Sequence, residues 1–509
     1  MSPVLFRHRH ASLVLAALAG LVFALTAPPT NLPWATLLGL GLFHLSLTAE
    51  PARPSRFAGA LRGLLFGTAA NLVALRFVPG VIVRFTPLPA VVAYLALLVL
   101  SCAQGLGWAL VGAFTRWLSE RHVPPPLAFA VAIFAGTYAP AVFPWTLAGG
   151  LTQWPILVQI ADIVGERGVA FCWAFICAGV VSSLRYRHPP SLVAALAMAC
   201  VLLRHGLVVP PAVEAARQEA PQVRIGLVQP GTEARERWEK GRAEVIVKRL
   251  HALTKVSELD GAELTVWPEA AYPYTLSHEA RRDDYGAGIV GYGLRGPILA
   301  GIILRGPDTS YNSAVLAGGD GSISRSQDKI RLLAFGEHVP FAEEVPWLKK
   351  TFARGTGLSP GKRNVILRHG ALAMGVLNCF EDTLTGASRD AFRDEHGTAN
   401  LLVNITNDAW FHGSAESELH EHLAVLRAVE LRRDLVRAVN QGPLSLVAAT
   451  GVIETRIYPT EPSTLLVRPR LLVLPPTLYA TYGDVPLLVL AGLVLVVALV
   501  RARLLRAGS

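Results

Sequence analysis

Long apolar runs separated by short polar joints occupy the first part of the chain, and this pattern predicts membrane-spanning helices. A bilayer core requires about 20 consecutive apolar residues per helix. By that measure we expect spans near residues 11–28, 32–49, 58–79, 87–115, 125–143, 166–184, 190–210 and 484–502. The sequence therefore predicts a polytopic α-helical membrane bundle of about eight spans.

A different pattern fills the region before the last apolar run. Short β-type runs alternate there with two stretches of helical periodicity, near 234–258 and 417–439. The runs lie near 223–229, 264–267, 298–304, 314–316, 372–377 and 401–405. Strands that alternate with helices in this way indicate one α/β domain.

The chain is therefore expected to have three regions. Residues 1–212 form an N-terminal transmembrane region of about seven helices. Residues 213–475 form the α/β domain, and residues 476–509 form a C-terminal transmembrane helix with a basic tail.

Composition supports a membrane protein and excludes one class of partner. Hydrophobic residues make up 52% of the chain, charged residues 17%, and the mean hydropathy is +0.41. The net charge of +10 comes largely from arginines that border the spans, where they set helix orientation and meet anionic headgroups. The sequence has no aromatic-basic RNA motif and no zinc-ligand spacing, so we expect neither nucleic acid, nor a metal, nor a cofactor. His412, His420 and His422 are interpreted as surface histidines.

Arginine positions also predict orientation. If the N-terminus with Arg7 and Arg9 is cytoplasmic, seven spans place the α/β domain on the opposite side of the membrane. A cleaved signal peptide over residues 1–28 is the alternative, because basic residues precede an apolar run. Further spans follow at once, which favours an uncleaved first helix.

Cys379 is the single cysteine of the α/β region. The other four cysteines lie in apolar segments, so Cys379 has no evident disulfide partner and is a candidate nucleophile. Glu269 ends a strand-like run and can take the thiol proton, while Lys329 can stabilise the thiolate and an oxyanion. Each of the three residues also has a purely structural interpretation. Cys379 could be a buried small side chain, Glu269 a helix N-cap, and Lys329 a solvated charge.

Several motifs carry a resemblance to a known family. They are Trp267-Pro268-Glu269 with Tyr272-Pro273, Lys329 followed by Phe335-Gly336-Glu337-His338-Val339-Pro340, Asn378-Cys379-Phe380-Glu381, Asn404-Ile405-Thr406-Asn407-Asp408-Ala409-Trp410-Phe411, and Tyr479-Ala480-Thr481-Tyr482-Gly483-Asp484. The domain resembles the carbon-nitrogen hydrolase (nitrilase) superfamily, and the whole layout resembles the apolipoprotein N-acyltransferase family. The resemblance implies an extracytoplasmic α/β domain of αββα type, on the periplasmic side of a bacterial cytoplasmic (inner) membrane.

The resemblance also implies a reaction and its partners. A monomer would load an acyl chain from a membrane phospholipid onto Cys379 as a thioester and pass it to the amine of a diacylglyceryl-cysteine lipoprotein. Glu269, Lys329 and Cys379 would form the catalytic triad. Supporting roles fall to Glu337 and Glu381, which would orient Lys329 and the attacking amine, to Trp238 on a lid over the entrance, and to Phe380 and Trp410.

Three segments depart from the family pattern. Phe380 stands where a Tyr is usual and removes a hydroxyl donor, Leu419-His420-Glu421-His422 replaces a Gln-His pair, and Asn440–Ser445 is altered. These departures concern acceptor preference more than the reaction. Two alternatives remain: a membrane-tethered nitrilase-type amidase with water as acceptor, and a transporter with a binding domain. Few paired ionisable residues occur in the spans, which disfavours the transporter.

Overall fold

The chain divides into two compact units. The structure, a computed structural model, describes residues 9–48, 56–234, 236, 239–283, 288–291, 293–333, 337–338, 357–411 and 413–507. The first unit is Met1–Pro210 with Thr477–Ser509, and the second is Pro211–Pro476. Trp238 and His412, both named above, lie outside the described residues.

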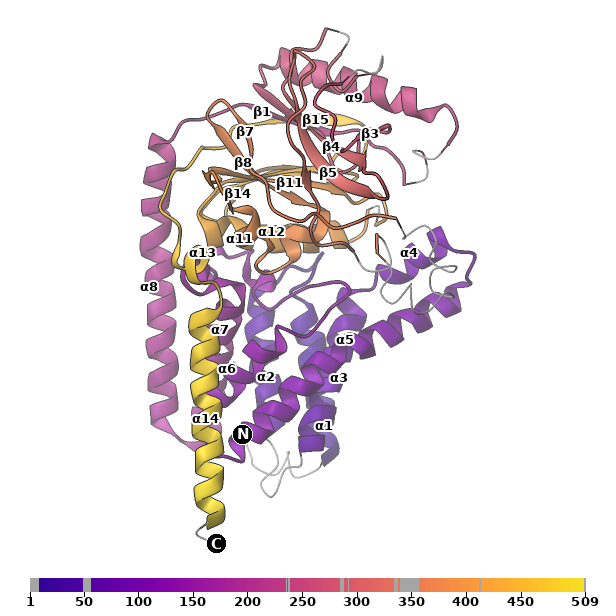
Figure 1. Ribbon diagram of the computed structural model, residues 1–509. Coiled ribbons are helices and arrows are strands. Elements are labelled where there is room, and N and C mark those ends of the chain that lie inside the picture. Colours follow the sequence, from indigo (N-terminus) through magenta and orange to yellow (C-terminus); the bar gives the residue numbers. More distant parts are fainter. Residues whose placement is uncertain are drawn as a thin grey trace. The chain divides into compact units, whose positions relative to one another are not determined.

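Helices make up the first unit (Figure 1). They are α1 (Arg9–Ala24), α2 (Pro33–Thr48), α3 (Arg56–Ala74), α4 (Val78–Phe85), α5 (Ala90–Ser119), α6 (Pro125–Gly136), η1 (Gly149–Leu151), η2 (Pro155–Leu157), α7 (Ala161–Tyr186), α8 (Pro189–Glu219), α13 (Leu478–Tyr482) and α14 (Val485–Ala507). Each of the eight predicted spans contains a helix. The helix predicted at 58–79 ends at Ala74, and α4 forms separately after it.

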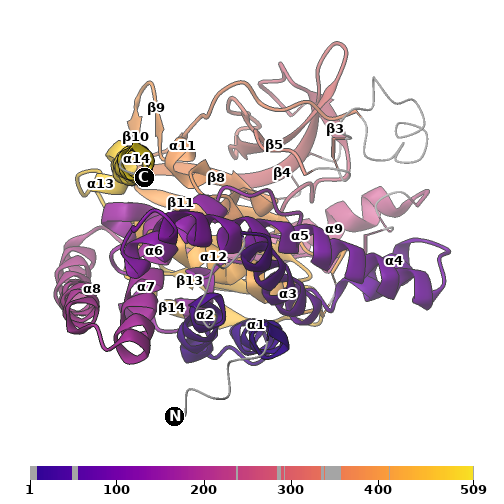
Figure 2. The same ribbon diagram turned by 90° about the horizontal axis from the view of Figure 1, so that it is seen from below.

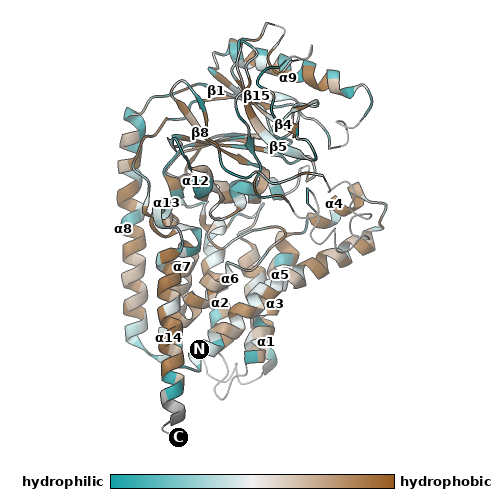
Figure 3. Cartoon of the chain, in the orientation of Figure 1, coloured by the Kyte–Doolittle hydropathy of each residue, from teal (hydrophilic) through white to brown (hydrophobic). Residues whose placement is uncertain are grey.

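Five described helices are long and apolar enough to cross a membrane: α3, α5, α7, α8 and α14. The described parts of α1, α2 and α6 are shorter, so the count of eight spans stays a prediction. Large apolar side chains lie exposed along the long helices, among them Leu95, Val99 and Leu110 of α5 and Val193 and Leu207 of α8. Figure 3 shows α14 brown over most of its length and teal near its C-terminal end. Apolar exposure on this scale is typical of contact with lipid.

Helix α7 takes part in two ion pairs among the described residues of the first unit. His205 Nε2 of α8 lies 2.9 Å from Asp162 Oδ1 of α7, and these helices run side by side (Figure 2). Arg167 Nη1 of α7 lies 2.6 Å from Asp484 Oδ2, next to the start of α14. α7 is kinked at Gly165, where φ is +68° and an added Cβ would stand 2.2 Å from the Tyr479 ring. Only glycine fits there.

Two sheets form the centre of the second unit. The first has seven strands: β1 (Ile225–Gln229), β2 (Leu264–Val266), β3 (Thr275–Ser277), β4 (Ile298–Arg305), β5 (Ser310–Ala317), β6 (Gln327–Asp328) and β15 (Ser463–Val467), in the order β15-β1-β2-β4-β5-β6 with β3 beside β4. The second has six: β7 (Leu367–His369), β8 (Leu372–Asn378), β11 (Leu401–Asn407), β12 (Leu435–Asn440), β13 (Leu444–Val447) and β14 (Ile453–Ile457), in the order β14-β13-β12-β11-β8-β7. β9 (Arg393–Asp394) and β10 (Gly397–Thr398) form a separate small pair.

The alternation of side chains along the strands produces a layered domain. On β4, Leu299 joins a core shared by both sheets, whereas Ile298, Ala300 and Ile302 join a second core with helix α9 (Arg242–Leu259). Helices α11 (Ala387–Ala391) and α12 (Glu416–Leu431) lie on the far side of the second sheet (Figure 1). The described part of the domain is therefore an αββα sandwich.

Two helix boundaries differ from the prediction. The helix predicted over 417–439 ends at Leu431, because Arg432 adopts a left-handed conformation with φ +51° and the next residues pair with β11 as strand β12. The helix predicted from 234 begins only at Arg242, after Gly241 with φ +82°. In both cases a left-handed residue interrupts the helix.

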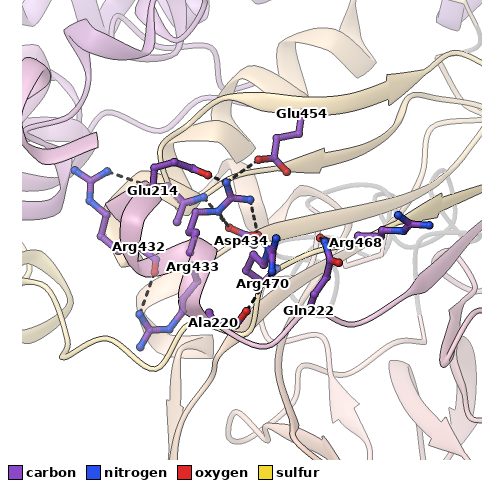
Figure 4. A network of polar contacts seen from close by, with 11 residues as sticks. Glu214, Ala220, Gln222, Arg432, Arg433, Asp434, Glu454, Arg468 and Arg470 are labelled. Atoms are coloured by element: carbon purple, nitrogen blue, oxygen red, sulfur yellow. Dashed lines mark hydrogen bonds and ion pairs between the residues drawn. The ribbon is translucent and has the colours of Figure 1, made fainter. Parts of the chain in front are cut away.

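A buried arginine binds the end of α8 to the domain. The Arg217 guanidinium donates to both Asp434 oxygens, at 2.8 and 2.9 Å, and to Glu454 at 2.6 Å and Glu214 at 2.7 Å. Figure 4 shows Glu214, Asp434 and Glu454 gathered at this place. Asp434 also accepts the backbone N–H groups of Ala449 and Arg470. Because all of these residues belong to the second unit, the last turn of α8 is part of the domain.

Candidate active site

Glu269 follows β2 at its carboxyl end, after Trp267 and Pro268. The neighbouring strand β4 passes so close that a Cβ at Gly301 would lie 2.2 Å from the Pro268 carbonyl oxygen. Glycine is therefore required at position 301, and the close approach fixes the turn that carries Glu269. The Glu269 side chain is only 9% exposed. Its place at the end of a parallel strand is where α/β domains usually hold their chemistry.

Lys329 follows β6 directly and is buried between two carboxylates. Its Nζ lies 3.1 Å from Glu269 Oε1 and 2.8 Å from Glu337 Oε2. Burial acts to lower the pKa of Lys329, but the charges of Glu269, Cys379 and Glu337 outweigh it and raise the pKa well above its ordinary value. The ammonium group therefore stays charged.

Cys379 lies at the junction of β8 and the short helix η5 (Cys379–Thr383). Its φ of +56° is in the left-handed region, which a side chain other than glycine adopts at a cost of about 1–3 kcal/mol. The Asn404 amide holds this turn by donating to the carbonyls of Leu377 at 3.2 Å and Cys379 at 3.0 Å. Burial and the charge of Glu269 raise the pKa of the thiol well above its ordinary value, although Lys329 opposes them.

Glu381 bonds to backbone rather than to Lys329. One of its oxygens accepts the N–H groups of Ile330 at 2.8 Å and Arg331 at 2.9 Å, and the other accepts the N–H of Asn378 at 2.9 Å. Burial raises the pKa of Glu381, and these N–H groups act against it. Glu381 thus joins the loop after Lys329 to the turn that carries Cys379.

Asn312 is a further site residue that the motifs do not reveal. From β5, its amide nitrogen donates to Glu269 Oε1 at 2.7 Å and to Glu337 Oε1 at 2.8 Å. Its oxygen accepts from Asn378 Nδ2 at 3.3 Å. Strand β5 begins Ser-Tyr-Asn-Ser, so Asn312 stands among other polar residues and the sequence gives no local signal for it.

The remaining predicted residues have varied positions. The Phe380 ring centroid lies 5.3 Å from Lys329 Nζ, a cation–π distance. Glu337 accepts the Leu333 N–H at 2.9 Å in addition to its two side-chain contacts. Trp410 is 48% exposed. The prediction for Trp238 falls outside the described residues.

The interpretation of His420 and His422 as surface residues is wrong. Both are buried in α12, with 3% and 2% of their surface exposed. Both residues lie on parts of the helix that face the interior of the domain. There, His420 Nε2 is hydrogen-bonded to Asp382 Oδ1. Asp408, Glu416 and His420 have potential metal-ligand atoms within 4.8 Å of one another. These are the described residues that could hold a metal.

The geometry defines a class of enzyme: a nitrilase-type domain with a carboxylate, a lysine and a cysteine placed at strand ends. Residues 294–464 match the family described as carbon-nitrogen hydrolase, and residues 19–179 match the apolipoprotein N-acyltransferase N-terminal domain. Among solved structures, an amidase from Nesterenkonia sp. AN1 is 18% identical, with a TM-score of 0.38, over 52% of this chain and 98% of its own.

Curated relatives specify the family further. The apolipoprotein N-acyltransferase of Geobacter metallireducens is 30% identical over 466 residues, which is 86% of each chain. That of Shewanella oneidensis is 30% identical over 522 residues, covering 96% of this chain and 95% of its own. The chain belongs to the apolipoprotein N-acyltransferase family. It is a multi-pass membrane enzyme with an acyltransferase domain of the nitrilase type.

Proposed function

We propose that the chain transfers an acyl chain from a membrane phospholipid, through a thioester on Cys379, to the N-terminal amine of a diacylglyceryl-cysteine lipoprotein. The observation that carries this proposal is the ammonium of Lys329, held between Glu269 and Glu337 beside a cysteine in a strained turn. A permanent positive charge at a buried point is what an oxyanion intermediate requires.

In the first half-reaction, Glu269 takes the proton of the Cys379 thiol as sulfur attacks the ester carbonyl of the phospholipid. The carbonyl oxygen becomes an oxyanion stabilised by Lys329. When the intermediate collapses, the bond between the carbonyl carbon and the glycerol oxygen breaks. Glu269 returns its proton to that oxygen, so a lysophospholipid leaves and a thioester remains.

In the second half-reaction, the α-amine of the lipoprotein attacks the thioester carbonyl. Glu269 accepts a proton from the amine, Lys329 again stabilises the oxyanion, and the Cys379 thiolate leaves. Proton return from Glu269 restores the thiol, and the product is an amide. The mechanism needs no metal and no cofactor in either step.

The membrane arrangement is part of the proposal. We infer about eight spans, an N-terminal transmembrane region over 1–212, a catalytic domain over 213–475 and a final helix with a basic tail over 476–509. The catalytic domain faces the periplasm and the spans lie in the bacterial inner membrane, since arginines gather at one set of loops. The enzyme acts as a monomer on two lipid substrates that reach it from the bilayer.

Mass spectrometry of the intact protein tests the covalent step. After incubation with phospholipid and no acceptor, the protein should gain the mass of one acyl chain, and neutral hydroxylamine should remove it as it removes a thioester. Cys379→Ala should carry no adduct, whereas Cys177→Ala, which removes a buried cysteine of α7, should carry it as wild type does. A diacylglyceryl-cysteine peptide should discharge the adduct into an amide. An adduct retained in Cys379→Ala would disprove the assignment, and rapid discharge by water alone would favour the amidase.

A further inference from the structure

A second cluster of ionisable side chains lies behind the turn of Cys379. Asp382 belongs to η5, three residues after the nucleophile, and Asp408 follows strand β11. Glu416 and His420 are one turn apart on α12 and therefore lie on the same face of the helix. Asp382, Asp408 and His420 are buried, and neither half-reaction uses any of the four.

The contacts of His420 orient its ring like that of a metal ligand. Its Nε2 is hydrogen-bonded to Asp382 Oδ1, and its Nδ1 lies 3.9 Å from Asp408 Oδ1. In many metal sites, a carboxylate accepts the N–H of one ring nitrogen and so fixes the tautomer that leaves the other nitrogen for the ion. Here the nitrogen on the opposite side from Asp382 faces Asp408, and a Glu416 ligand atom completes a set within 4.8 Å.

Three carboxylate oxygens of this cluster lack a hydrogen-bond partner. They are Asp382 Oδ2, which faces Arg437 at 3.5 Å, and Asp408 Oδ2 and Glu416 Oε2, and all three atoms are inaccessible to solvent. Asp408 is only 1% exposed as a residue. A buried acceptor without a partner costs about 1–3 kcal/mol, more when it is charged. A cation at this place would supply the missing interaction.

The local charges point to a cation of charge two. The carboxylates around the cluster are Asp382, Asp408, Glu416 and Glu421, and the arginines are Arg437, 3.5 Å from Asp382, and Arg456, 2.9 Å from Glu421. With His420 neutral, four negative and two positive groups leave a net charge of −2.

We propose that Asp408, Glu416 and His420 bind one divalent transition-metal ion, with Asp382 as the outer carboxylate that orients His420. One imidazole nitrogen and two carboxylates are a donor set that suits Zn²⁺ and Mn²⁺. Ligand atoms around a tetrahedral ion lie about 3.4 Å apart. The distance between His420 Nδ1 and Asp408 Oδ1 is 3.9 Å, so a small side-chain movement would bring the two atoms to that separation. The ion ties α12 to the segment after β11, and it fixes His420, which is hydrogen-bonded to Asp382 of η5 near the turn of Cys379. It takes no part in the acyl transfer.

Titration of the purified full-length protein in detergent tests this site. After chelator treatment and its removal, Zn²⁺ and Mn²⁺ are added separately and followed by calorimetry, and Co²⁺ is followed by its visible absorption. We expect one ion per chain at micromolar affinity and a higher unfolding temperature in its presence. Glu416→Gln and His420→Gln should each weaken binding by at least about 10-fold.

Two matched controls lie on the same helix. Glu418→Gln makes the same charge change two residues from Glu416, and His422→Gln replaces a histidine as buried as His420. Both should bind the ion as wild type does. If His420→Gln does not fold, Glu416→Gln decides, because residue 416 begins the helix and is partly exposed. The proposal is overturned if wild type binds none of the three ions, or if Glu416→Gln binds them with unchanged affinity.

Discussion

At the residue scale, the proposed nucleophile Cys379 is a thiol whose pKa is raised above its ordinary value. Burial and the charge of Glu269 raise its pKa, whereas the charge of Lys329 lowers it. Alkylation by iodoacetamide requires the thiolate, so the rate for Cys379 should be slow at neutral pH and should still be rising above about pH 9. Since Glu269→Gln removes a charge that raises the pKa, alkylation at pH 8 should become faster in this variant, while acyl loading from phospholipid is lost.

The rate is measured by mass spectrometry of the Cys379 peptide, with Cys379→Ala as the blank. Lys329→Met should change the alkylation rate in the opposite direction. It removes the charge that lowers the thiol pKa, so alkylation should become slower. Slower alkylation in Glu269→Gln than in wild type would contradict the assigned electrostatics. Faster alkylation together with normal acyl loading in Glu269→Gln would show that Glu269 is not the base.

Asn312 provides a second residue-scale prediction. Its single amide nitrogen holds both Glu269 and Glu337, so Asn312→Ala should release the two carboxylates from their shared donor. We expect a loss of about 10- to 100-fold in kcat with little change in KM, because positioning is impaired rather than lipid binding. Asn312→Asp should be worse, since it keeps the shape but replaces the donor with a third negative charge. Equal activity of Asn312→Asp and wild type would show that the contact is incidental.

The sequence reveals some of these residues and hides others. Glu269 and Lys329 were predicted to act together, and their side chains are in contact. Their catalytic roles and that of Cys379 stay predictions. Asn312 could not be found because a lone amide in a strand has no local signature, and its partners are far away in the chain. Glu381 accepts backbone N–H groups, which the motif did not reveal, and its expected role toward Lys329 and the attacking amine stays a prediction.

At the scale of elements, the end of α8 depends on one buried ion pair. Arg217→Met would leave Asp434 buried without its guanidinium partner, which typically costs about 3–5 kcal/mol. Arg224→Met is the matched control, because its partner Glu263 and Arg224 itself are about half exposed and such pairs contribute at most about 1 kcal/mol. Tryptophan fluorescence during urea unfolding in detergent measures the difference. A similar loss of unfolding free energy in the two variants would show that the buried ion pair stabilises the domain no more than the exposed one.

Element boundaries show where periodicity alone fails. The spacing of apolar residues over 417–439 is compatible with a single helix. Leu435–Asn440 nevertheless forms strand β12, which pairs with β11. The nearly continuous apolar run Leu435–Val439, which Arg437 alone interrupts, suits a buried strand equally well. Contacts distant in sequence therefore decided the outcome. The main strands were predicted close to their observed positions, because short apolar runs between turn residues usually form strands.

At the scale of the whole molecule, the arginine pattern predicts sidedness. A reporter that is active only outside the cytoplasm should be active when fused after Arg224 or near Val467, and silent when fused at Arg187 or Arg506. Arg187 lies between α7 and α8 and therefore reports on the opposite end of α8 from the domain. The reverse pattern of activity would place the acyltransferase domain in the cytoplasm and exclude the lipoprotein reaction.

The distribution of the site over the two sheets affects when the enzyme becomes reactive during its synthesis. Glu269 and Lys329 follow strands of the first sheet, whereas Cys379 follows a strand of the second. Glu381 accepts the backbone N–H groups of Ile330 and Arg331, and these two hydrogen bonds form only after the sheets have packed together. On the proposed mechanism, a nascent chain with one sheet formed holds either the base and the cation or the nucleophile, never all three. Cleavage of phospholipid would then begin only when the domain is complete.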